Sequence, residues 1–149
     1  MEDMLVHAEA AIQRGDFEAA IRTLTTALAE EPDNPRALAD IGVAFTEALI
    51  GPLNHELTER FWGWRPNDIL DVTDNVNNMQ LGVLEVTRRA TIELAERISR
   101  TGSTASFDPH LEQAMNWLMV KATEYCFPPA ETKYKDAMDE SALYRDRLQ

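Results

Sequence analysis

Seven residues near the N-terminus, Gly15-Asp16-Phe17-Glu18-Ala19-Ala20-Ile21, place the tightest constraint on what this chain can fold into. The residues before them, 2–14, are rich in alanine and contain no proline or glycine, which favours a helix. Gly15 stands where the end of a helix accepts a left-handed residue, and Asp16 is a good N-cap for the next helix. The sequence therefore predicts two short helices, over residues 2–14 and 17–30, that are joined by a tight turn.

The second of these helices has a clear apolar face and a clear end. Its apolar residues recur at spacings of three and four, as expected for one buried side of a helix. Pro32 follows the helix, and Asp33-Asn34-Pro35 is a turn that opens the next helix with Pro35 at its first position. The apolar face consists of Phe17, Ala20, Ile21, Leu24, Ala27 and Leu28.

Two short antiparallel helices that meet at Gly-Asp-aromatic and end before a proline resemble a tetratricopeptide repeat. His7 departs from that pattern, because an aliphatic residue is more usual at its position. The small residues let two helix backbones approach closely, and a single repeat needs neighbours because it cannot bury both of its faces. The matching positions are Ala8, Ala11, Ala20, Leu24, Ala27 and Pro32.

A second repeat begins in phase, 34 residues after the first. Leu38, Ile41, Gly42 and Phe45 match the first-helix pattern, but Ile50-Gly51-Pro52 replaces the turn that should follow. We therefore expect a helix over residues 35–49 and a degenerate second helix over 53–62. The resemblance covers residues 1–66, and the expected fold is all-α, with repeat-like hairpins followed by a bundle over residues 67–149.

Residues 68–100 predict one long amphipathic helix within that bundle. Apolar side chains recur along it at spacings of three and four, which indicates a continuous buried stripe. Leu81 and Leu84 widen the stripe, so a bundle core fits better than a two-stranded coiled coil. The stripe consists of Ile69, Val72, Val76, Met79, Val83, Val86, Ala90, Leu94 and Ile98.

Two further helices are expected after a loop at residues 101–106. Asp108-Pro109 predicts the start of the first, which should run to Phe127-Pro128-Pro129. Its expected buried side consists of Leu111, Ala114, Met115, Leu118, Ala122 and Cys126. Residues 130–148 predict a docked helix with a thin apolar stripe of Tyr134, Met138, Ala142 and Leu143.

Residues 74–148 also resemble a bacterial domain family of uncharacterised function. The matching pieces are Asp74-Asn75, Gln80-Leu81-Gly82-Val83-Leu84, Pro129-Ala130-Glu131 with Tyr134, and Tyr144 with Leu148. This resemblance implies no activity, and the bundle region is expected to pack against residues 1–66 as one compact domain.

The charge of the chain restricts its partners. Acidic residues outnumber basic ones by 26 to 14, giving a formal charge of −12, and residues 1–80 alone carry 15 acidic and 5 basic residues, net −10. Such a surface repels nucleic acid and anionic lipid and either attracts a basic partner or simply keeps the protein in solution. Cys126 is the only cysteine, and neither a secretory signal nor a membrane-spanning run is expected, so we predict a cytoplasmic protein without membrane insertion.

No pattern indicates an enzyme, a metal or a cofactor. His55 and Glu59 form a pair four residues apart, but two ligands do not make a metal site. Cys126 has no basic residue nearby to activate its thiol, so an inert buried thiol is expected. Arg88, Arg89, Arg97 and Arg100 either bind a phosphate or an acidic partner, or pair with Glu85, Glu93 and Glu96 at helical spacing.

The remaining hypothesis is a non-enzymatic adaptor, chaperone-like or assembly subunit that binds another protein. In a tetratricopeptide-like groove, a basic or helical segment would contact the first helix of each repeat; the alternative is a structural subunit whose long helix completes a homo-oligomer or a larger complex. Trp62 and Trp64 are either partner anchors or a plug between the two regions. The expected partner-binding residues are Leu5, Glu9, Ile12, Asp40, Val43, Glu47, Trp62 and Trp64.

Overall fold

The computed structural model describes residues 1–61, 63–67, 74–98, 107–124 and 128–149. These residues form helices and no strand, which confirms the predicted all-α fold. A π-helical segment over His55–Glu59 follows α3, and another over Leu94–Ile98 follows α4. The α-helices are α1 (Glu2–Gln13), α2 (Phe17–Glu30), α3 (Pro35–Asn54), α4 (Asp74–Glu93), α5 (Pro109–Leu118) and α6 (Ala130–Leu148).

The turn between α1 and α2 has the predicted geometry. Gly15 has a positive φ of 75°, a conformation that glycine adopts without steric cost. The Asp16 side chain accepts a hydrogen bond from the Ala19 amide at 3.1 Å, as an N-cap does. Ala8, Ala20 and Ala27 are fully buried, so the small residues lie where the helices pack closely.

The predicted break after residue 49 is wrong, because α3 continues through Pro52 to Asn54. Proline in a helix costs about 3 kcal/mol, partly through the hydrogen bond that it cannot donate. Leu49, Leu53 and Leu57 are all buried, and burial of a leucine contributes about 1.5–3 kcal/mol. Tertiary burial of these leucines therefore outweighs the helix-breaking proline, whose own ring is exposed.

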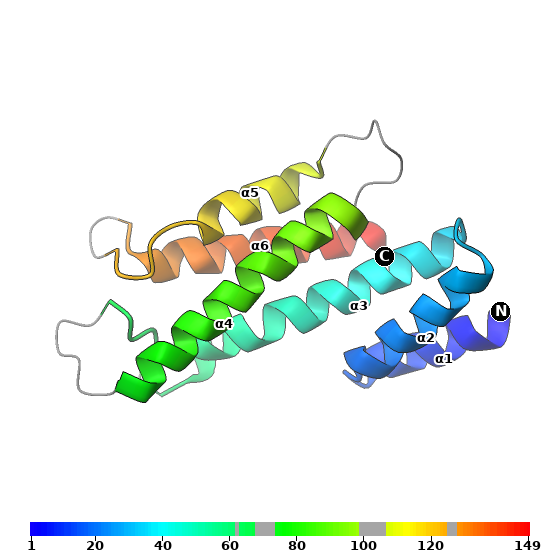
Figure 1. The fold of residues 1–149 in the computed structure, drawn as a ribbon, viewed down its shortest axis with the longest axis horizontal. Helices are drawn as coiled ribbons and strands as arrows, with labels where there is room; N and C mark the ends of the chain where they lie inside the picture. The colour runs from blue at the N-terminus through cyan, green and yellow to red at the C-terminus, as the bar shows by residue number, and fades with distance from the viewer. Residues whose placement is uncertain (62, 68–73, 99–106, 125–127) are drawn as a thin grey trace.

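The helix α3 lies at the centre of the arrangement (Figure 1). The α1/α2 hairpin packs near its N-terminal half, α6 runs along it, and α4 crosses it, while α5 packs on α6. Gly42 permits the close approach of α6, since a Cβ atom there would lie 2.6 Å from Leu148 Cδ1. The predicted boundary at residue 66 between a repeat region and a bundle stays a prediction. The helix α3 packs against the α1/α2 hairpin and also against α4 and α6.

The main core is built around α6. The sequence predicted only that this helix docks on the bundle through a thin apolar stripe. Tyr134 and Met138 are buried as predicted, but Leu143 is exposed and Tyr144 is buried in its place. A hydrogen bond from the Tyr134 hydroxyl to the Val120 carbonyl, 2.7 Å long, fixes the ring. The buried residues of this core are Leu53, Leu57, Trp64, Leu84, Ala114, Leu118, Ala130, Tyr134, Ala137 and Met138.

The long helix is present over residues 74–98, but its predicted apolar stripe faces the core only in part: Leu94 is fully buried and Val83 packs against the main core. The side that faces the core carries Gln80, Leu84, Thr87 and Thr91, all buried. By contrast, Met79 is 42% exposed and Val86 is 68% exposed. The stripe residues Ile69 and Val72 lie outside the described residues.

Polar residues of this helix can face the protein core because their hydrogen bonds are made within the protein. The Thr87 and Thr91 hydroxyls donate to carbonyls of the preceding turn, at 2.9 and 2.8 Å. The Gln80 amide donates to Glu56 Oε2 at 3.0 Å and to the Gly63 carbonyl at 2.9 Å, and its oxygen accepts from the Arg65 amide at 2.9 Å.

The helix that begins at Pro109 is shorter than predicted and ends at Leu118. Arg88 of α4 caps this end, because its guanidinium donates hydrogen bonds to the carbonyls of Leu118 and Val120. A cation at the C-terminus of a helix is favourable, since the last carbonyls have no helical partner. Cys126 and the predicted loop at 101–106 lie outside the described residues.

Candidate functional site

Four of the predicted partner-binding residues line one opening between α1 and α3, which we call the acidic groove. These are Glu9 and Ile12 of α1 with Asp40 and Val43 of α3. The groove has a volume of about 390 Å³ and is bordered by Leu148 and Gln149 at the end of α6. The spacing of side chains on two separate helices therefore brings these four residues together as the sequence indicated.

The charges of the acidic groove are only partly neutralised. Arg36 donates hydrogen bonds to Glu9 Oε1 at 2.9 and 2.6 Å and to Glu2 at 2.7 Å. Among the described residues, Asp40 Oδ2 is buried without a hydrogen-bond partner. Burial and the neighbouring Glu9 raise the pKa of Asp40. A cationic group of a partner would relieve both effects, because it would pair with the carboxylate that lacks a donor.

The other predicted contact residues are placed elsewhere. Leu5 is buried in the hairpin core with Leu24, and Glu47 forms an ion pair of 2.6 Å with Arg145 of α6. Trp64 is a core residue rather than an exposed anchor, since its indole donates to the Ala122 carbonyl at 3.1 Å and its ring packs edge-on against Tyr134. Trp62 lies outside the described residues.

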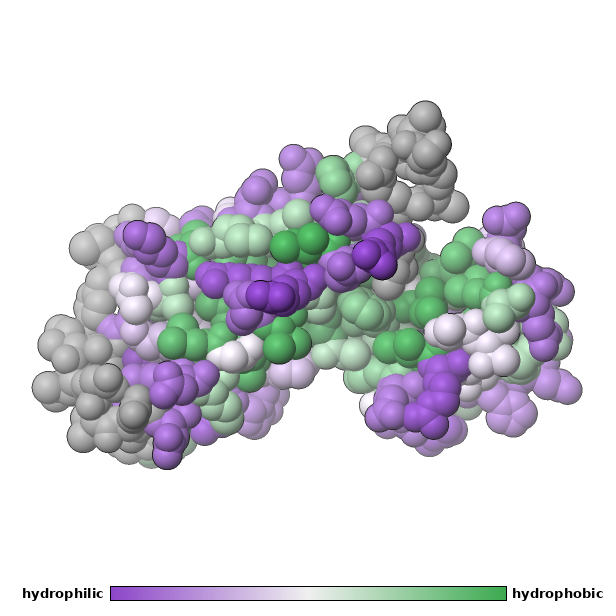
Figure 2. All heavy atoms as spheres, viewed as in Figure 1, coloured by the Kyte–Doolittle hydropathy of each residue, from purple (hydrophilic) through white to green (hydrophobic). Residues whose placement is uncertain are grey.

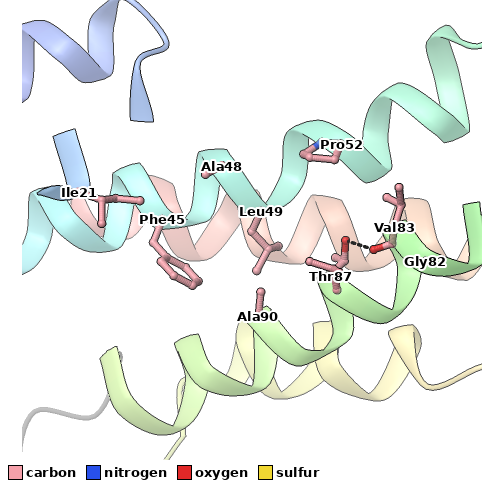
Figure 3. A pocket seen from close by; sticks show the side chains of 10 residues that line it. Ile21, Phe45, Ala48, Leu49, Pro52, Gly82, Val83, Thr87 and Ala90 are labelled. Carbon is pink, nitrogen blue, oxygen red and sulfur yellow. Dashed lines mark hydrogen bonds between the residues drawn. The ribbon is translucent and has the colours of Figure 1, made fainter. Parts of the chain in front are cut away.

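A second opening, which the sequence did not predict, lies between α2, α3 and α4 (Figure 3). We call it the apolar groove; its volume is about 460 Å³. Apolar side chains are visible in the recess between the α1/α2 hairpin and α4 (Figure 2). Its lining consists of Ile21 from α2, Phe45, Ala48, Leu49 and Pro52 from α3, and Gly82, Val83, Val86, Thr87 and Ala90 from α4.

The only polar side chain in that lining is already engaged. The hydroxyl of Thr87 donates to the Val83 carbonyl at 2.9 Å within α4, so it is not free for a ligand (Figure 3). Val83, Val86 and Ala90 belong to the stripe that the sequence identified as apolar. The signal for this groove was therefore present in the periodicity, but the periodicity does not say which face meets the core.

The described residues show no cluster of potential metal ligands. His55 Nδ1 lies 2.9 Å from Glu59 in an exposed pair, and no group of three potential metal ligands occurs in the part of the chain that the structure describes. Arg89 and Arg97 pair with Glu85 and Glu93, both at 2.7 Å, which supports the ion-pair alternative for the basic residues. Arg100 lies outside the described residues.

None of the helices in the described part has the length and hydropathy that a membrane crossing requires.

The comparisons with known proteins identify a family but no activity. A family model described as "Uncharacterized protein conserved in bacteria (DUF2333)" matches residues 15–149. No curated protein and no solved structure matches the chain. The family match agrees with the predicted resemblance of residues 74–148 to an uncharacterised bacterial family and extends it toward the N-terminus.

Proposed function

The chain belongs to the DUF2333 family of uncharacterised proteins conserved in bacteria, and from this premise we propose that it is a non-enzymatic protein–protein interaction module. It would act as an adaptor, chaperone-like or assembly subunit, with α1, α2 and the start of α3 forming a tetratricopeptide-like unit. The acidic groove would receive a segment of the partner that carries a basic side chain. A cytoplasmic location stays a prediction from the sequence.

One observation carries this proposal: Asp40 presents a carboxylate with an unpartnered oxygen in a groove that also offers Ile12 and Val43. Keeping a charged carboxylate partly buried without a donor costs free energy, and a Lys or Arg of the partner would recover it. The apolar neighbours would add contact area beside the charge. The net charge of −12 would steer a basic segment toward the protein.

Affinity purification of the tagged full chain from bacterial cells, with quantitative mass spectrometry, tests the proposal. Asp40→Lys should remove the specific partner, because it reverses the charge inside the groove. Asp33→Lys is the matched control, since it makes the same change of net charge at an exposed turn residue. The proposal fails if no partner exceeds background, or if both variants retain or lose the partner equally.

A second candidate is a structural subunit whose long helix completes a homo-oligomer or a larger complex. The exposed stripe of α4 favours it, because Met79 and Val86 leave apolar area in water that a further subunit would cover. Sedimentation over a range of concentrations tests the homo-oligomer, and a monomer at every concentration argues against it.

A further inference from the structure

The apolar groove is lined by rows of residues at helical spacing. Phe45, Ala48, Leu49 and Pro52 form a row along α3 at spacings of three, one and three, and Val83, Val86 and Ala90 form a second row along α4 at spacings of three and four. Such rows are what one helix presents to another. The two rows converge on the same opening, with Ile21 of α2 as a third wall (Figure 3).

The chemistry of the lining restricts what can fill the opening. Every side chain is apolar except Thr87, whose hydroxyl is used within α4. A polar ligand, or an extended peptide, would bury its hydrogen-bonding groups here without partners, at a cost of about 1–3 kcal/mol each. A helix satisfies its own backbone donors and acceptors and presents only side chains, so it avoids this cost.

The charge of the surrounding surface selects among possible helices. The helices that line the groove, over residues 17–30, 35–54 and 74–98, carry eight acidic and five basic side chains, net −3. A second copy of the chain would bring its own charge of −12 toward this surface and be repelled. A helix with Lys or Arg beside its apolar face would be attracted.

We propose that the apolar groove is a docking site for an amphipathic helix of another protein, with apolar residues at positions i, i+3 or i+4, and i+7 and a basic polar face. This inference rests on the proposed interaction function, but it assigns a different surface from the acidic groove. Val86 would lie under the docked helix, because its side chain lines the groove and is 68% exposed.

Selection from a displayed library of random peptides tests this site directly and needs no identified partner. The peptides should have about 18 residues, enough for about five helical turns. Peptides retained by the wild-type chain should share the apolar spacing, carry net positive charge and become helical on binding. Fluorescence anisotropy should then show at least about tenfold weaker binding to Val86→Asp, and the same loss with Ala48→Glu on the opposite wall.

Val6→Asp is the matched control, since Val6 is 52% exposed on α1 and does not line the groove. This variant should bind the peptides as the wild type does, and Asp40→Lys should bind them nearly as well. Loss of binding only in Asp40→Lys would retain the proposed function and overturn this site.

Other results would also overturn the inference. Selected peptides without helical spacing, selected peptides with net negative charge, or equal binding by Val86→Asp and the wild type would each contradict it. A concentration-dependent dimer that Val86→Asp abolishes would instead identify a second copy as the occupant. Far-ultraviolet circular dichroism of each variant excludes misfolding as the cause of lost binding.

Discussion

The inward and outward faces of α4 both mix polar and apolar side chains. The inward face carries Gln80, Thr87 and Thr91 beside the buried Leu84, whereas the outward face carries the apolar Met79 and Val86 together with the ion pair of Glu85 and Arg89. Hydrogen bonds within the protein make the polar residues compatible with the core. Polar side chains can therefore face the core when their hydrogen bonds are made within the protein, and apolar side chains of the same helix can stay exposed.

The largest expected effect concerns the leucine of the inward face. Leu84→Ala should lower the free energy of unfolding by about 2–5 kcal/mol, because Leu84 is fully buried in the main core and the change leaves a cavity. Val86→Ala should change it by less than about 0.5 kcal/mol, because that side chain is largely exposed. Urea unfolding followed by circular dichroism measures both. Equal effects of the two variants, or a larger effect at Val86, would contradict the assignment of Leu84 to the buried face and Val86 to the exposed face.

The next effect concerns the buried amide of the same face. Gln80→Leu should lower the free energy of unfolding by about 1–3 kcal/mol, because it leaves the Gly63 carbonyl and the Arg65 amide without the partner that Gln80 provides. Gln113→Leu, at a half-buried position of α5, makes the same chemical change and should have a smaller effect. Thermal unfolding compares them, and a neutral Gln80→Leu would show that the network contributes little to stability.

A third pair of variants compares two neighbouring arginines. Arg88→Met should cost about 1.5–3 kcal/mol, because it removes charged hydrogen bonds to the carbonyls of Leu118 and Val120. Arg89→Met should cost less than about 1 kcal/mol, because Arg89 makes an exposed ion pair with Glu85. Hydrogen exchange of α5 should report the difference locally. Similar protection of α5 in both variants would contradict the role of Arg88 at the end of that helix.

The smallest effect is the pH dependence that Glu56 adds through its bond to Gln80. Burial raises the pKa of Glu56, but hydrogen bonds from Arg60 and Gln80, together with the charges of Arg60 and His55, lower it below the ordinary value of 4.5. A lowered pKa stabilises the folded state above that value, and the stabilisation is lost as the pH falls through the folded pKa. The difference in stability between the wild type and Glu56→Gln should therefore shrink on acidification. A difference that grows at low pH would contradict this sign.

Local features of the sequence determined the elements of this protein. Gly15 and Asp16 predicted the first turn, and Asn34-Pro35 and Asp108-Pro109 predicted two helix starts, because caps and glycine turns depend on a few adjacent residues. The acidic groove was partly predictable for a related reason: the in-phase pattern of two helices indicated which side chains would lie on the same side. The resemblance of residues 74–148 to a bacterial family was likewise visible in short stretches of sequence.

Tertiary structure decided the direction of faces and the length of helices. The leucines beyond Pro52 kept α3 continuous because their burial depends on α6 and on the segment around Trp64, which no local pattern contains. Arg88, 30 residues away in sequence, supplies the hydrogen bond to the last carbonyl of α5. The apolar stripe of α4 was recognised as a stripe, but its placement toward the groove depended on Gln80 and the threonines finding hydrogen bonds inward. Periodicity determines that a helix has two faces, and only packing decides which of them is buried.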